Sequence, residues 1–206
     1  MNKKKLTLII SITLILLVTI LVTIYVINNK NKENNNISEE VKKVDEIKEY
    51  NYYLEEDATS YYKEVYNELK EVINKEEIDY KEYAINVSKL FVIDLFTLNN
   101  KISSNDVGGL QFIYPDFKDN FIKIAQTSLY SGIKNNIYGD RNQELPIVNN
   151  VNVIEINEST FSFNDTSYEA YEIKVGIEYE KDLEYPNEYK ITLIKNDKYI
   201  QVVSGE

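Results

Sequence analysis

The first pattern in the chain is an uncharged, apolar run over residues 6–27. A helix rises about 1.5 Å per residue, so this run would span roughly 33 Å, which matches a hydrocarbon core of about 30 Å. The alternative is a cleaved signal peptide. The run exceeds the usual apolar region of about 7–15 residues, however, and no small-x-small cleavage site follows it. The pattern therefore predicts a transmembrane signal anchor.

The residues that follow the run are polar. Residues 28–45 show no apolar periodicity, which predicts a flexible tether. The three lysines within residues 1–5 outweigh Lys30 and Lys32, so the positive-inside rule makes residues 1–5 a cytoplasmic tail. Residues 46–206 are then expected to form one extracytoplasmic domain.

Helical spacing of apolar residues predicts three helices in this domain. A short strand is expected over residues 50–55, and the first helix over residues 57–73. The second helix carries the strongest start signal, a capping-box spacing that begins at Asp79. Its residues 90–98 are apolar nearly all round, which predicts the central buried helix. The third helix begins at Pro115, a residue suited to the first helical turn.

The spacing then changes to the two-residue period of strands. Strands are expected over residues 147–157, 160–163 and 171–179, and a final hairpin pairs residues 189–195 with residues 199–203. A short strand, three helices and an antiparallel meander define an α+β class. We expect three helices packed on one face of a curved antiparallel sheet.

Composition excludes much chemistry. The 206 residues include no His and no Cys, which rules out Ser-His-Asp or Cys-His catalysis, imidazole or thiolate metal sites, and disulfides. The net charge of −11 opposes binding of nucleic acid, which needs clustered basic residues. Abundant Asn, Lys, Ile and Tyr, together with a single Arg, indicate a low-GC Gram-positive bacterium. We expect no metal and no other cofactor.

Asp94 is the most interesting carboxylate, because it interrupts the apolar run of the second helix. If it faced a pocket, burial would raise its pKa and make it a candidate general base. The alternative, which we favour, is that it lies on a solvated edge or bonds a neighbouring element. Gly108 and Gly109 lack the spacing of a phosphate-binding loop, so a turn is expected there.

A second polar group lies further along the chain. Asp140, Asn142 and Glu144 have the alternate spacing of a calcium loop, but Leu145 occupies the position where such a loop needs Gly. A simple turn with exposed polar groups is therefore favoured. Arg141 is expected to pair with a carboxylate and pin this loop rather than bind an anion, because a planar guanidinium suits a fixed bidentate pair.

The order of elements behind one N-terminal span is similar to the nuclear-transport-factor-2-like cone fold. It resembles most the extracytoplasmic domains of bitopic components of bacterial conjugation and type IV secretion systems, over about residues 46–204. Two stretches, NDVGG at 105–109 and YGDRNQELP at 138–146, also resemble segments of an uncharacterised Gram-positive membrane-anchored family. The cone resemblance implies a pocket that some members use for catalysis and many use only for assembly.

These features favour a membrane-anchored extracytoplasmic interaction or scaffold domain of the cell envelope, without enzymatic activity. The expected partners are the membrane, through one span, and an envelope protein, such as part of a secretion or conjugation assembly. The alternative is a small-ligand-binding or carboxylate-dependent enzyme domain that uses the cone pocket. A pocket in which Asp94 and other polar groups converge would favour the alternative, and a pocket filled by aromatic side chains would oppose it.

Overall fold

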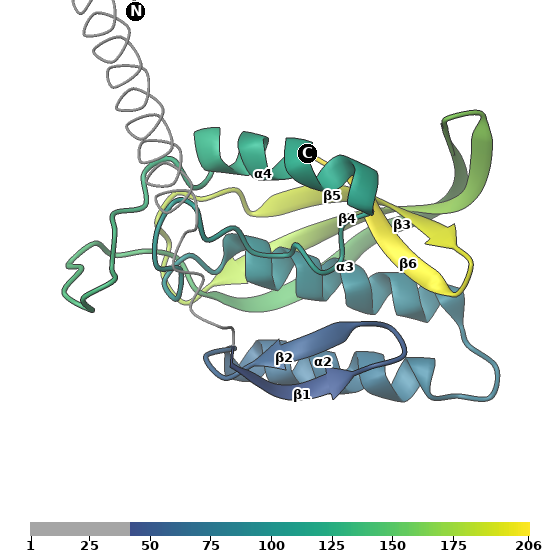
Figure 1. Ribbon diagram of the computed structural model, residues 1–206, viewed down its shortest axis with the longest axis horizontal. Helices are drawn as coiled ribbons and strands as arrows, with labels where there is room; N and C mark the ends of the chain where they lie inside the picture. Colours follow the sequence, from purple (N-terminus) through teal and green to yellow (C-terminus); the bar gives the residue numbers. More distant parts are fainter. Residues whose placement is uncertain (1–41) are drawn as a thin grey trace, which may run out of the picture. The chain divides into compact units, whose positions relative to one another are not determined.

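The computed structural model describes residues 42–206 (Figure 1). The predicted tail at 1–5, the predicted anchor at 6–27 and most of the predicted tether at 28–45 lie outside the described residues. Within residues 42–206, no helix is both long enough and apolar enough to cross a membrane. The first described element is strand β1 (Lys43–Ile47), so part of the range predicted as tether forms a strand.

The helices begin where the sequence predicts. Strand β2 (Tyr52–Glu55) pairs with β1 and leads into α2 (Ser60–Ile73). Helix α3 (Tyr80–Phe96) starts after Asp79, whose carboxylate accepts two backbone N–H groups of the first turn, so the predicted cap is confirmed. Helix α4 (Pro115–Thr127) has its proline in the first turn, also as predicted.

Four strands form one antiparallel meander in the order β3-β4-β5-β6. They are β3 (Val148–Phe163), β4 (Thr166–Tyr179), β5 (Glu188–Asn196) and β6 (Tyr199–Gly205). The two strands predicted at 147–157 and 160–163 are a single long strand. The turn residues at 164–165 have φ values of 48° and 60°, which a type I′ hairpin turn requires.

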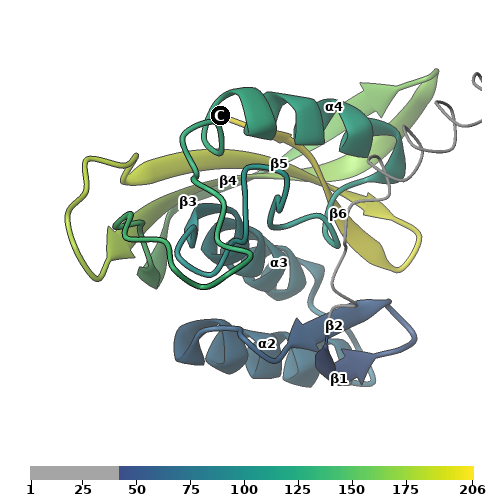
Figure 2. The ribbon, with the colours of Figure 1, turned by 60° about the vertical axis from the view of Figure 1, so that its left-hand side comes forward.

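The α+β class with a curved antiparallel sheet is confirmed, but the helices are not all on one face. Helix α3 lies between the sheet and α2, with residues such as Leu90 and Phe91 fully buried (Figures 1 and 2). The start of α4 packs on the opposite face, where Phe117 contacts a small cluster containing Ala170 and Ile194. Helix α3 is apolar all round, so it is covered by the sheet on one side and by α2 on the other. Helix α2 therefore packs mainly on α3 rather than on the sheet.

Candidate functional site

Asp94 lies on α3 and bonds the chain that follows this helix. Its Oδ1 accepts a hydrogen bond from Lys101 Nζ at 2.6 Å, and its Oδ2 accepts one from the backbone N–H of Gly109 at 2.6 Å. The Lys101 side chain is only 6% exposed. Burial lowers the pKa of Lys101, but the adjacent charge of Asp94 outweighs this effect and raises the pKa above its ordinary value. The favoured interpretation, that Asp94 bonds a neighbouring element, is therefore confirmed.

Gly108 and Gly109 allow the loop to approach α3 closely. A Cβ atom at Gly108 would collide with the backbone carbonyl of Asp94, and one at Gly109 would lie 2.7 Å from the Phe91 ring. Gly109 also has a φ of 77°, a conformation that favours glycine. The Tyr130 hydroxyl completes the contact, because it accepts the N–H of Gly108 at 3.0 Å and donates to the α3 backbone. The glycine pair serves packing.

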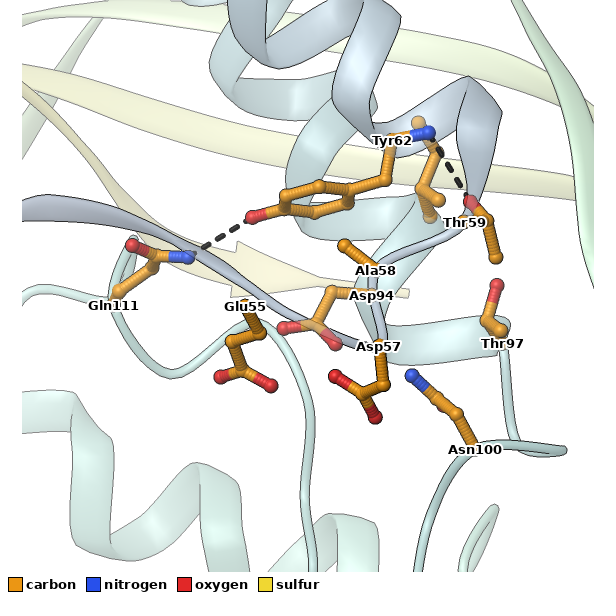
Figure 3. A pocket seen from close by; sticks show the side chains of 10 residues that line it. Glu55, Asp57, Ala58, Thr59, Tyr62, Asp94, Thr97, Asn100 and Gln111 are labelled. Atoms are coloured by element: carbon orange, nitrogen blue, oxygen red, sulfur yellow. Dashed lines mark hydrogen bonds between the residues drawn. The ribbon is translucent and has the colours of Figure 1, made fainter. Parts of the chain in front are cut away.

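A small pocket opens beside Asp94 (Figure 3). Its cavity volume is about 20 Å³, which is enough for one or two water molecules. Polar side chains from β2, from the turn before α2, from α2 itself, from α3 and from the loop after α3 converge on it. They are Glu55, Asp57, Thr59, Tyr62, Asp94, Thr97, Asn100 and Gln111.

Glu55 is the one functional candidate in this pocket that the sequence did not reveal. Burial, followed by the nearby charge of Asp94, raises the pKa of Glu55 to about 7, although Lys101 opposes the shift. At neutral pH this carboxyl group is therefore partly protonated. Across from it, the buried Tyr62 hydroxyl accepts a hydrogen bond from Gln111 Nε2 at 2.9 Å (Figure 3).

A binding or catalytic role was expected if Asp94 and other polar groups converged on a pocket. The pocket meets this condition only in part. Polar groups do converge with Asp94, yet both Asp94 oxygens are already bonded, so this residue acts as a structural clamp. Within residues 42–206 no group of three His, Cys, Asp or Glu side chains is placed to hold a metal ion. The pocket therefore offers one carboxyl group, that of Glu55, with a pKa near neutral pH. This group lies at the wall of a space that can hold water.

A second site is built around Arg141. Its Nη1 donates to the carbonyls of Lys101 at 2.7 Å and Lys134 at 3.2 Å, and its Nη2 donates to the carbonyl of Asn99 at 2.7 Å. Arg141 therefore pins its loop, as predicted. The predicted carboxylate partner is wrong: backbone carbonyls take that place, because the several donors of one guanidinium can reach three carbonyls on two chain segments together.

Asn136 fixes the turn that precedes Arg141. Its backbone N–H donates to the carbonyl of Ile102 at 2.8 Å, and its side-chain Oδ1 accepts the N–H of Arg141 at 2.9 Å. Its carbonyl accepts the N–H of Gly139 at 2.9 Å, and Gly139 adopts a φ of 71°. The turn is thus bonded to the rest of the domain at its start and closed on itself at its end.

This turn presents two apolar side chains to solvent. Tyr138 is 90% exposed and Ile137 is 57% exposed. The N–H of Ile137 is itself bonded to the side chain of Asn135 at 2.8 Å. Large apolar groups on a fixed turn are typical of a binding surface, because holding the backbone in place leaves little entropy to lose on binding. We call residues 134–143 the Tyr138 loop.

The three residues with the spacing of a calcium loop, Asp140, Asn142 and Glu144, do not converge on one point. Glu144 forms an ion pair with Lys181 of the loop after β4. Asp140 and Asn142 are exposed, and their side chains form no hydrogen bond with other described residues. The expectation of a turn with exposed polar groups agrees with this arrangement.

Protein-family models, curated proteins and solved structures were compared with the chain, and none of them matches. The cone-fold resemblance therefore remains a prediction.

Proposed function

We propose that the chain is a membrane-anchored extracytoplasmic interaction domain of a Gram-positive cell envelope, and that its partner binds the Tyr138 loop. The observation that carries this proposal is the side chain of Tyr138, which is 90% exposed on a turn held by backbone hydrogen bonds. Tyrosine is enriched at binding sites because its ring gives a large contact area with few rotatable bonds.

The location rests on the apolar run at residues 6–27 and on the lysines before it. It is tested with protease added to intact, wall-stripped cells. The expected result is that the domain is degraded while a cytoplasmic marker survives. Full protection of the domain in cells that degrade another surface protein would contradict the proposed location.

The interaction is tested by placing a photo-crosslinking phenylalanine analogue at position 138 of the full chain in intact cells. A matched probe at Asn157, which is exposed on β3, reports random collisions. We expect a discrete adduct from position 138 that is absent from position 157. Adding Arg141→Ala should reduce the adduct at least fivefold, because the turn loses its fixed position. Equal labelling from both positions would overturn the proposal.

A second candidate function, binding of a small polar ligand or carboxylate-dependent chemistry, is supported by Glu55. This residue supplies a carboxyl group with a pKa of about 7 at the wall of a small pocket, and such a value suits proton transfer near neutral pH. Its test is a thermal-shift screen with small amines and polyols. A ligand that raises the Tm of the wild type but not of Glu55→Gln would support this function, and uniform shifts in both would refute it.

A further inference from the structure

We infer that the ligand of the Tyr138 loop is a neutral glycan, an inference that rests on the proposed function. The loop surrounds an open hollow of about 390 Å³, which falls within the roughly 300–1,000 Å³ typical of small-ligand sites. Residues on both sides of Tyr138 in the chain line this hollow. They are Lys134, Asn135, Asp140, Arg141, Asn142 and Gln143.

The residues that line the hollow are all polar or charged, which argues against an apolar protein side chain as its occupant. The centre of a protein interface is depleted in charged residues and is built around apolar or aromatic anchors in desolvated pockets. A sugar presents hydroxyl groups in place of such an anchor. Asp140 and Asn142 offer planar carboxylate and amide groups that are not bonded to other described side chains, and each can accept or donate two hydrogen bonds to neighbouring hydroxyls.

The charges around the hollow favour an uncharged ligand. The terminal nitrogens of Arg141 are committed to the backbone carbonyls of Asn99, Lys101 and Lys134. The guanidinium therefore lacks the free fork that binds a phosphate or carboxylate. The remaining charges, Lys134 and Asp140, are opposite in sign. A net charge of −11 on the whole chain further repels polyanions.

Tyr138 lies on the same loop but does not line the hollow. One face of a pyranose ring carries C–H groups, and an aromatic ring covers such a face well because its faces carry negative charge density. The Tyr138 ring is exposed and its backbone is already fixed, so stacking costs little ordering entropy. Tyr138 and the free carboxylate and amide groups of Asp140 and Asn142 thus belong to one loop. Together they give the two kinds of contact that a neutral sugar needs.

The test is isothermal titration of the full chain in phosphatidylcholine nanodiscs, prepared without sugar detergents. The probes are linear tetramers of glucose and of N-acetylglucosamine. We expect saturable binding of at least one probe. Tyr138→Ala should weaken this binding at least tenfold and Asn142→Ala at least fivefold, whereas Tyr138→Phe should stay within threefold of the wild type. Ile154→Ala, which removes an exposed apolar group on β3, is the matched control and should change nothing.

The outcomes separate this inference from the proposed function. Absence of binding to both probes, together with a protein adduct from position 138, would overturn the glycan and leave the interaction domain in place. Binding that is insensitive to Tyr138→Ala would also overturn the glycan assignment to this loop. Absence of both sugar binding and any adduct would overturn the two together.

Discussion

The Asp94 pocket and the Tyr138 loop use polar side chains in opposite ways. At the pocket, the Asp94 carboxylate accepts hydrogen bonds from the buried Lys101 ammonium and from the backbone N–H of Gly109. In the loop, the side chains of Arg141 and Asn136 bond backbone groups, and the ring of Tyr138 is left exposed to solvent. A charged residue in an apolar helix is conspicuous in a sequence, yet here its role is to hold the fold. The exposed tyrosine, in contrast, is available to contact a ligand.

Lys101 connects the two regions. Its ammonium group bonds Asp94, while its backbone carbonyl accepts a hydrogen bond from Arg141 at 2.7 Å. The next residue, Ile102, accepts the N–H of Asn136. The segment that Asp94 holds against α3 is therefore the base on which the Tyr138 loop rests. We therefore expect substitutions at Asp94 to reduce stability, and substitutions at the surface of the Tyr138 loop to reduce binding.

The largest effect is expected from Asp94→Ala. This change leaves the buried ammonium of Lys101 without its partner, which typically costs about 3–5 kcal/mol. Urea unfolding of the full chain measures the loss, and the double variant Asp94→Ala with Lys101→Met should recover part of it. Glu172→Ala, which removes an exposed ion pair with Lys190, is the control and should leave the midpoint unchanged. A loss below about 1 kcal/mol for Asp94→Ala would contradict the clamp.

A smaller effect is expected from Arg141→Ala. Loss of hydrogen bonds to three backbone carbonyls should lower the free energy of unfolding by about 1–3 kcal/mol. Arg141→Lys keeps the charge but lacks the planar fork, so we expect it to behave like the alanine variant. Full rescue by lysine would show that charge, and not the carbonyl network, holds the loop.

Glu55→Gln should change stability only at higher pH. The pKa of Glu55 is about 7 in the folded chain against about 4.3 in an unfolded one. Protonated Glu55 therefore favours folding, and this contribution is lost as pH rises toward and through 7. With solvent screening at a partly exposed group, the variant should gain about 1 kcal/mol at pH 8 and nothing at pH 4. Thermal unfolding at both pH values measures this difference, and a gain equal at both would contradict it.

The smallest change in stability is expected from Tyr138→Ala. Its ring is 90% exposed, so the free energy of unfolding should move by less than about 0.5 kcal/mol. Binding at the loop should nevertheless fall at least tenfold. A large loss of stability with binding retained would reverse the comparison between the two regions.

Much of the fold was predictable from the sequence because local rules govern it. The cap at Asp79 and the proline at the start of α4 depend on neighbouring residues, and each occurs as predicted. The position of α4 on the second face of the sheet was not predictable, because an amphipathic stripe does not specify which apolar surface it covers.

The sites were less predictable than the fold. Asp94 was found because it breaks an apolar pattern, but its bonds to Lys101 and Gly109 depend on how a loop folds back. Glu55 carries no local signal at all, since its raised pKa arises from burial and from a residue on another element. The exposure of Tyr138 follows from hydrogen bonds between segments about 35 residues apart, such as that from Asn136 to Ile102.

The most direct measurement of the central claim is amide hydrogen exchange at the Tyr138 loop in the wild-type chain. We expect the N–H groups of Asn136, Gly139 and Arg141 to exchange slowly, because each is bonded to a backbone or side-chain oxygen. Arg141→Ala should accelerate all three. If these amides exchange in the wild type as fast as those of an unstructured peptide, Tyr138 is not held on a fixed turn, and the account is wrong.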